Sequence, residues 1–469
     1  MSLKKKIAAN VVLRLLGKFG SLAISLFVIG ILTRHLGPSN FGYYTVAMTF
    51  IQIFSTLTNL RLPQILTRRI SQADADQEVE VSNIVTLQAV AGAIFTLAPL
   101  VALFFPYDRV IPIAIAIAAI SGWTGLLRGV LNGIFERNVA TWKVGVVELV
   151  GRVLTLIGTL IVAVIGGGLL AFIMVLSISS IGQFMLTLFM AKKYVTIRPR
   201  INYQLWLSTL RESWPLAVMA IIGLAASRSD ILLLSIMRSP AEVGLYSAAQ
   251  KILNVIGLLP PIFLGLVFPL LALEWSRHNL SGLRHKMSLS FDLLAIIILP
   301  IVFGTLATAS DIMAFVGGIK FIAAGPILTL FMISASTTYW RSLCFCVILA
   351  AGQQQQLIKY HVINAVFSFF LFFKFIPPYG IYAAAMVVVL SQLFMTVVVT
   401  IIMNSLAHFR PNFQRLSKIF IASGLMCALL ISLKGMPFFP RFGIGVATYF
   451  ILSVLSRSFS LTEIRAILK

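Results

Sequence analysis

Charged residues are scarce in this chain of 469 residues, and acidic residues are the scarcest of them. Only 11% of the residues are charged, less than half the roughly 25% of an ordinary soluble domain. A cytosolic enzyme, a secreted domain and a disordered chain are therefore excluded. With 14 acidic and 37 basic residues, the formal net charge is +23.

Cysteine and histidine are also rare, with 3 and 5 copies. The cysteines lie in apolar runs without a CxxC pair, which indicates helix packing rather than metal binding. No histidine has a metal-ligand neighbour at helical spacing, and the sequence holds no nucleotide-binding motif. We expect no metal, no cofactor and no enzymatic activity. The cysteines are Cys344, Cys346 and Cys427, and the histidines are His35, His278, His285, His361 and His408.

Apolar residues make up 59% of the chain, and the mean hydropathy is +0.99. A membrane-spanning helix needs about 20 apolar residues, so we predict an all-α integral membrane protein with about fourteen transmembrane helices. Glycine and proline mark the turns between them. The predicted spans are 10–33, 41–63, 81–105, 110–135, 142–165, 168–191, 213–237, 243–273, 288–308, 322–350, 358–376, 379–404, 417–433 and 441–457.

The basic residues divide unevenly between the two sides of this topology. Twenty-three lie on the side that holds both termini, and six lie on the other side. The positive-inside rule therefore predicts that both termini are cytoplasmic. Because membrane topology accounts for the charge, we do not expect nucleic acid as a partner. The basic, aromatic segment 192–212 is predicted to be an interfacial amphipathic linker, with a docking surface for a partner enzyme as the alternative.

One seven-residue pattern occurs twice, 202 residues apart. The segments 38–44 and 240–246 both read Pro-x-x-apolar-Gly-x-Tyr and both lie on the predicted outer side. The repeat predicts two parallel six-helix lobes related by a pseudo-twofold axis, an N-lobe over 1–200 and a C-lobe over 201–404. Residues 405–469 add two helices and a cytoplasmic C-terminus. Two such lobes are typical of an alternating-access carrier.

The residues around these turns carry a family resemblance. Leu32-Thr33-Arg34-His35-Leu36-Gly37-Pro38-Ser39-Asn40-Phe41-Gly42-Tyr43-Tyr44 is similar to the first-loop signature of polysaccharide transporters. The stretches 230–249, 317–324 and 377–385 resemble further segments of the same family. These are the lipid-linked oligosaccharide flippases of the multidrug/oligosaccharidyl-lipid/polysaccharide (MOP) exporter superfamily.

The resemblance implies a flippase of the bacterial cytoplasmic membrane. Such a protein moves an undecaprenyl-pyrophosphate-linked glycan repeat unit from the inner to the outer leaflet, for O-antigen, lipopolysaccharide or exopolysaccharide synthesis. The implied partners are this lipid-linked oligosaccharide, the bilayer, and assembly proteins such as a polysaccharide polymerase. A cationic central cavity would bind the pyrophosphate and the sugars.

Charged residues inside the predicted spans are candidates for that cavity. A charge at the bilayer centre costs about 2.5–3.5 kcal/mol on insertion scales, so each needs a partner, water or a ligand. Arg228 and Arg341 lie about ten residues, or about 15 Å, from a span end. We predict that both contact pyrophosphate, because guanidinium binds phosphate bidentately. Lys251, Arg128 and Arg34 rank second. The eight cations within spans are Arg14, Lys18, Arg128, Arg152, Arg228, Lys251, Arg341 and Lys374.

Acidic residues in the spans are fewer. Glu148 and Arg152 stand four residues apart, which predicts an ion pair on one helix face. Asp230 and Glu148 are also candidates for coupling transport to H⁺ or Na⁺, and Asp292 is a further buried acid.

Three alternatives remain at this point. A lipid II-type flippase carries the same pyrophosphate anchor. An exporter of small cationic molecules from the same superfamily is disfavoured by the excess of buried cations. A membrane-embedded glycan polymerase or glycosyltransferase is disfavoured by the short outer loops.

Overall fold

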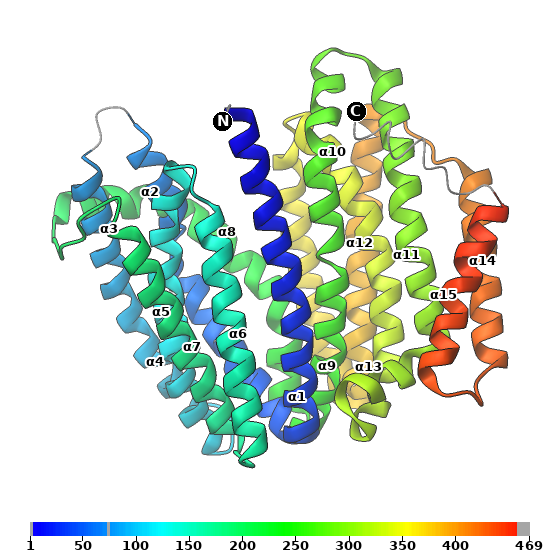
Figure 1. The fold of residues 1–469 in the computed structure, drawn as a ribbon, viewed down its shortest axis with the longest axis horizontal. Coiled ribbons are helices and arrows are strands. Elements are labelled where there is room, and N and C mark those ends of the chain that lie inside the picture. The colour runs from blue at the N-terminus through cyan, green and yellow to red at the C-terminus, as the bar shows by residue number, and fades with distance from the viewer. Residues whose placement is uncertain (1–2, 73–75, 457–469) are drawn as a thin grey trace. The chain divides into compact units, whose positions relative to one another are not determined.

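The computed structural model describes residues 3–72 and 76–456, with side chains from Gly20 onward except at 22–23 and at several positions between 215 and 227. The predicted cytoplasmic ends at 1–2 and 457–469, and the side chains of Arg14 and Lys18, lie outside the described residues. Within the described ranges the chain is helical and contains no strand, as predicted. The α-helices in Figure 1 are α1 (Leu3–Asn59), α2 (Leu62–Ile70), α3 (Gln77–Ala91), α4 (Leu97–Ala102), α5 (Val110–Arg137), α6 (Trp142–Val164), α7 (Leu169–Ala191), α8 (Tyr203–Met237), α9 (Pro240–Ile256), α10 (Leu259–Ser276), α11 (Leu280–Gly317), α12 (Gly325–Ala350), α13 (Leu357–Ala407), α14 (Phe413–Ser432) and α15 (Phe438–Leu455). Short 3-10 helices cover Gly92–Thr96, Ile319–Ala324 and Gln354–Gln356.

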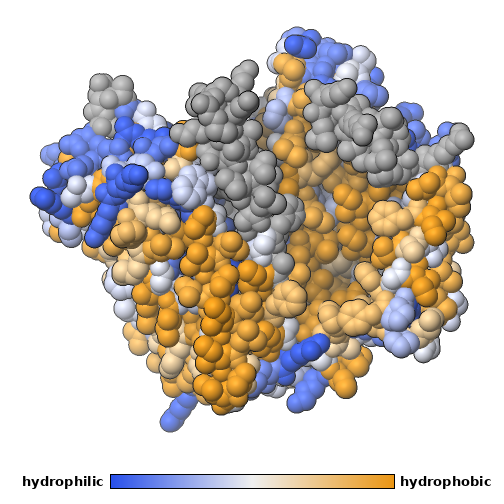
Figure 2. All heavy atoms as spheres, viewed as in Figure 1, coloured by the Kyte–Doolittle hydropathy of each residue, from blue (hydrophilic) through white to orange (hydrophobic). Residues whose placement is uncertain are grey.

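Long apolar helices confirm that the chain is a multi-pass membrane protein. Ten helical stretches of the described residues are long and apolar enough to cross a bilayer. Their outward-facing side chains are apolar too: Val164 is 85% exposed and Phe189 is 75% exposed. Figure 2 shows apolar side chains over the flanks of α6 and α7, with hydrophilic ones gathered at helix ends. The ten do not include α1 and α8, and the count of fourteen spans stays a prediction.

Two helices bend where glycine and proline predict turns. Gly37 in α1 has φ 68° and Gly380 in α13 has φ 60°, a left-handed region that glycine enters without steric cost. Pro38 directly follows Gly37, and Pro378 lies two residues before Gly380; proline has no N–H to donate to a helical hydrogen bond. The residues of four predicted spans therefore form two long bent helices.

Two features of the helix order differ from the prediction. The inner segment 64–80 lies between the predicted spans 41–63 and 81–105, where a loop and the start of a helix are predicted; it contains most of the separate helix α2 besides the start of α3. α2 is helical because Leu62, Ile65, Leu66 and Ile70 recur at helical spacing and are buried. The predicted span 243–273 is two helices, α9 and α10, separated at Gly257.

Residue contacts divide the chain into Met1–Gly244, here called unit 1, and Leu245–Lys469, here called unit 2. In unit 1, α5 packs on α7, and α1 packs on α5, α6 and α8. An apolar core of α2, α3 and α5 side chains closes one end of the unit. The predicted lobe boundaries rest on the sequence repeat and stay a prediction.

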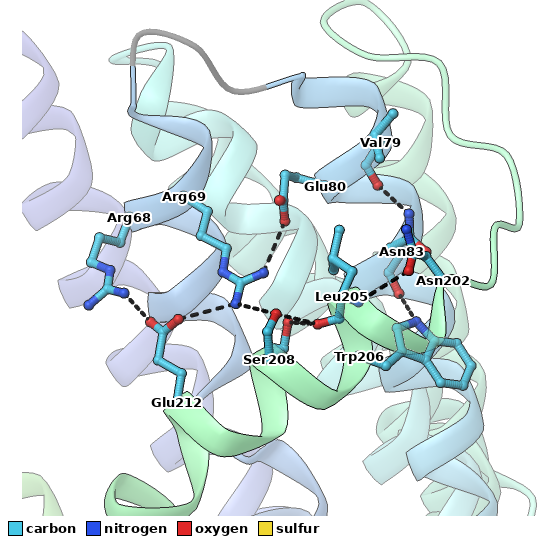
Figure 3. A network of polar contacts seen from close by, with 11 residues as sticks. Arg68, Arg69, Val79, Glu80, Asn83, Asn202, Leu205, Trp206, Ser208 and Glu212 are labelled. Atoms are coloured by element: carbon cyan, nitrogen blue, oxygen red, sulfur yellow. Dashed lines mark hydrogen bonds and ion pairs between the residues drawn. The ribbon is translucent and has the colours of Figure 1, made fainter.

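The start of α8 is fastened to that end of unit 1 by a polar network (Figure 3). Glu212 of α8 accepts from Arg68 at 2.5 Å and from Arg69 at 3.2 Å. Arg69 also pairs with Glu80 of α3 at 3.5 Å. The Trp206 indole donates to the Asn83 carbonyl at 3.2 Å. The C-terminal part of the predicted linker 192–212 therefore packs against α2 and α3.

Arg69 is expected to stabilise this end more than its neighbour Arg68 does. The Arg69 side chain is 14% exposed and the Arg68 side chain is 66% exposed, although both bind Glu212. Replacing Arg69 by glutamine should lower the unfolding free energy by about 1–3 kcal/mol, and replacing Arg68 by less than about 1 kcal/mol. Thermal unfolding of the purified variants measures both. Equal melting temperatures would show that the network does not stabilise the unit.

The two copies of the repeated motif lie face to face inside unit 1. A Cβ atom on Gly42 would lie 1.9 Å from the Pro240 carbonyl oxygen, and one on Gly244 would lie 1.9 Å from the Pro38 oxygen. Real Cβ atoms do not approach a backbone oxygen so closely. The contact is reciprocal, because each glycine receives the backbone of the other motif's proline. Glycine is therefore required at both positions.

In unit 2, α11 is the central helix, packing against α10, α12 and α14. The α14–α15 pair is fastened to α11 along its length. Arg415 pairs with the buried Asp292 at 2.9 Å, and the Tyr449 hydroxyl donates to the Ile296 carbonyl at 2.8 Å. Near the other end of α11, Arg441 pairs with Asp311 at 2.7 Å. These bonds explain how two helices outside the predicted repeat are held.

Arg441 is expected to be the strongest of these attachments. It is 2% exposed, and besides Asp311 it donates to the carbonyls of Leu430 at 2.6 Å and Ala307 at 3.0 Å. Arg441→Met should lower the unfolding free energy by about 2–4 kcal/mol, because three acceptors lose their donor. The matched control is Arg410→Met, at an exposed position. Melting temperatures that fall equally in both variants would contradict this role.

Candidate functional site

Polar side chains from three helices meet in the membrane-spanning part of unit 1. The half-buried Arg128 of α5 donates a hydrogen bond to the Gln183 side chain of α7. Gly151 of α6 leaves room for that amide, since a Cβ there would lie 2.0 Å from the Gln183 Cδ. Arg128 also interacts electrostatically with Glu148 and Arg152 of α6. Gln183 could not be predicted as part of this site, because a lone amide on an apolar helix has no distinguishing pattern.

The predicted Glu148–Arg152 ion pair is wrong. No ion pair joins the two among the described residues, and both side chains are exposed on α6. An i,i+4 pair contributes only about 0.3–0.5 kcal/mol, so competing interactions decide the side-chain positions. Here those are the attraction of Glu148 to Arg128 and the interaction of Arg152 with Tyr44.

Three other candidates of unit 1 lie on α1 and α8. Arg34 is exposed on α1, just before the bend at Gly37. Asp230 is 4% exposed, and its carboxylate accepts from the Ile231 backbone N–H at 2.8 Å. Arg228 is half-buried, and within the described part of the chain it has neither a hydrogen bond nor an ion pair. Arg228 and Asp230 therefore do not neutralise each other, as their spacing predicts.

A small polar cavity of about 220 Å³ lies between the end of α1 and α8 in unit 1. Asn59 and Arg61 line it, and the Asn59 Oδ1 atom is buried without a hydrogen bond. Leu60 and Arg61 have φ of 46° and 55°, a left-handed turn that places Arg61 at the cap of α2. In the sequence, Arg61 is one of the basic residues counted on the predicted cytoplasmic side, and nothing in the sequence predicts this cavity.

Unit 2 holds the remaining two candidates. Arg341 of α12 is half-buried, and no described residue forms a hydrogen bond or ion pair with it. It lies nine residues before the end of α12, about 14 Å along the helix. His361 of α13 lies close enough to interact with it electrostatically. Lys251 is half-buried on α9. Arg128, Arg34 and Arg228 belong to unit 1, so a single cavity holding all five cations stays a prediction.

The three cysteines are buried and free. Among the residues that the structure describes, no three His, Cys, Asp or Glu side chains group in a way that would hold a metal ion.

Comparison with known proteins gives a consistent result. Residues 7–273 match the model of a family described as polysaccharide biosynthesis protein. The chain is 22% identical over 433 residues to the succinoglycan biosynthesis transport protein ExoT of Rhizobium meliloti (strain 1021), covering 91% of this chain and 85% of that protein. These relatives support transport rather than catalysis.

Two solved structures share the fold. The lipid II flippase MurJ, in an inward closed conformation, has a TM-score of 0.77 at 14% identity, covering 95% of this chain and 99% of that one. An inward-facing multidrug resistance MATE family transporter of the MOP superfamily has a TM-score of 0.65 at 12% identity, covering 83% and 94%. The predicted MOP-type fold is confirmed.

Proposed function

Because the chain belongs to the polysaccharide biosynthesis protein family, we propose that it is a flippase for undecaprenyl-pyrophosphate-linked oligosaccharide repeat units. It moves them from the inner to the outer leaflet of the bacterial cytoplasmic membrane by alternating access. Both termini are cytoplasmic in this proposal, and polysaccharide assembly proteins receive the product.

The observation that carries the proposal is positive charge without a described partner on two helices that are predicted to cross the membrane. Arg228 and Arg341 are half-buried, and neither has a hydrogen bond or ion pair within the described residues. Burying a charge without a partner is costly. A pyrophosphate supplies acceptors that guanidinium groups bind bidentately, so a ligand of this class suits each of these guanidinium groups. Lys251, Arg128 and Arg34 are the secondary contacts.

Ion coupling is the second part of the proposal. Asp230 is the preferred group for H⁺ or Na⁺, because it is the more deeply buried acid, and Glu148 is the other candidate. A transmembrane pH or Na⁺ gradient should accelerate transport by the wild type and not by Asp230→Asn.

A lipid II-type flippase is the second candidate function. It is favoured by the fold shared with a protein named lipid II flippase. Both substrates carry pyrophosphate on a lipid, so the same guanidinium groups suit either one. The similarity to a MATE family transporter would suggest an exporter of small molecules. That function gives no reason for guanidinium groups without a partner, because no pyrophosphate is bound.

Transport can be tested with the purified chain in sealed vesicles. One set of vesicles receives a pyrophosphate-linked oligosaccharide lipid, and a matched set receives lipid II. The readout is the fraction of each headgroup that an external enzyme can reach over time. Faster translocation of the oligosaccharide lipid supports the proposal, and faster translocation of lipid II favours the second candidate. A chemically altered lipid would overturn both in favour of an enzyme.

A further inference from the structure

A cavity within unit 2 is lined by none of the candidate cations. It has a volume of about 520 Å³ and lies between the end of α11, the start of α12 and the α14–α15 turn. That volume is in the range of small-ligand sites. The last residues of α11 lie at the end of a 38-residue helix, which is longer than the roughly 20 residues that cross the hydrocarbon core. Because the cavity lies at the end of this helix, we expect it at the level of lipid headgroups.

Asp311 supplies a fixed negative charge to the cavity. Arg441 holds one of its oxygens, Oδ2, at 2.7 Å. Arg441 is itself immobilised by two backbone carbonyls. The Asp311 side chain is nevertheless 42% exposed, so its other oxygen can accept hydrogen bonds from a bound ammonium group. The carboxylate is thus oriented before any ligand arrives.

Lys434 supplies a positive charge to the same cavity. Its side chain is exposed, and no described residue forms a hydrogen bond or ion pair with it. The hydroxyls of Ser310 and Thr329 also line the cavity, and neither is hydrogen-bonded to a described residue. An ammonium and two hydroxyls are donors suited to a phosphate group.

A ligand that satisfies both charges must be a zwitterion with a phosphate and a primary ammonium. Leu306 and Leu330 form an apolar part of the lining, and Leu306 is 44% exposed, which suits the glycerol and acyl region of a lipid. We propose that this cavity binds the phosphoethanolamine headgroup of a phospholipid. Phosphatidylglycerol lacks the ammonium that Asp311 needs. Phosphatidylcholine lacks N–H donors for the carboxylate.

The bound headgroup has a structural consequence. It contacts α11, the start of α12 and the turn that carries Lys434, and so joins the α14–α15 pair to α12. The proposal concerns lipid binding alone and does not depend on the transported substrate.

Lipid binding can be measured by native mass spectrometry of the intact chain in detergent. The probes are phosphatidylethanolamine, phosphatidylglycerol and phosphatidylcholine with identical acyl chains, and soluble phosphoethanolamine. We expect phosphatidylethanolamine to bind about tenfold more tightly than the other two lipids, and Lys434→Gln to remove that preference. The matched control is Lys320→Gln, an exposed lysine that does not line the cavity.

Each result has a definite meaning. Equal affinity for phosphatidylglycerol, or a preference that survives Lys434→Gln, would overturn the proposal. Soluble phosphoethanolamine that displaces the lipid completely at equal concentration would also overturn it, because the acyl region would then contribute nothing. Asp311→Asn should weaken binding as well. Because Asp311 also pairs with Arg441, the melting temperature of the Asp311→Asn variant is compared with that of the wild type. The Lys434→Gln variant is the decisive test of lipid binding.

Discussion

Replacing Arg341 or Arg228 by glutamine is expected to slow translocation of a pyrophosphate-linked oligosaccharide lipid at least about tenfold. Each guanidinium is half-buried and, within the described chain, without a hydrogen bond or ion pair, and in the proposed function the ligand compensates it. A hydrogen bond to a charged group contributes about 1.5–3 kcal/mol, and 1.4 kcal/mol corresponds to a factor of ten. The initial rate of headgroup exposure in sealed vesicles measures the loss.

The matched control is Lys374→Gln. Lys374 is also predicted to lie within a span, but it is exposed and lies over the Phe375 ring. Arg341→Lys tests the chemistry further: it keeps the charge and loses the bidentate geometry, so the rate should fall between those of wild type and Arg341→Gln. If Arg341→Gln, Arg228→Gln and Lys374→Gln all transport at the wild-type rate, the site assignment is wrong while the flippase proposal stands.

Adding one methyl group at Gly42 or at Gly244 is expected to destabilise the chain and reduce transport more than tenfold. In each case the new Cβ would lie 1.9 Å from a backbone oxygen of the opposite motif. Backbone atoms cannot rotate away as a side chain can, so the start of α9 and the bend of α1 must separate. Overpacking of this kind costs about 1–3 kcal/mol. Thermal unfolding and the vesicle assay measure the two effects.

Gly125→Ala is the control, because nothing lies within 4 Å of a Cβ built there. The double variant makes a sharper test. Once one methyl group has separated the two motifs, the second meets less resistance, so the combined destabilisation should be smaller than the sum of the single ones. Strictly additive losses would indicate that the two glycines do not share one contact.

The helices and their bends could be predicted because the signals are local. Apolar runs predict the spans, and a glycine with a proline within two residues predicts each bend, at Gly37 and at Gly380. α2 could not be predicted by hydropathy, because nine amphipathic residues that include Arg68 and Arg69 resemble a basic loop. Its burial depends on the next helix, α3, and on the more distant α5.

The charged candidates show the same limit. The sequence identifies Arg128, Arg228 and Arg341 as charges in apolar helices, which is a local property. It does not show that Gln183 binds Arg128, or that Asp292 binds Arg415 across 123 positions of sequence. The Glu148–Arg152 prediction failed because helical spacing permits a contact and does not require one. Partners from distant helices decide which polar groups are neutralised.

The pairing of the buried Arg441 with Asp311 has a consequence for biosynthesis. Asp311 belongs to α11 and Arg441 to α15. The ribosome therefore synthesises Asp311 well before Arg441. Until α15 emerges, Asp311 lacks the only described residue that pairs with it. Arg441 in turn enters the membrane among apolar residues and finds its acceptors only on α11 and α14. In the sense of insertion followed by association, docking of α14 and α15 on α11 thus follows the synthesis of α15, and a nascent chain that stops before α15 leaves the Asp311 carboxylate without its described partner.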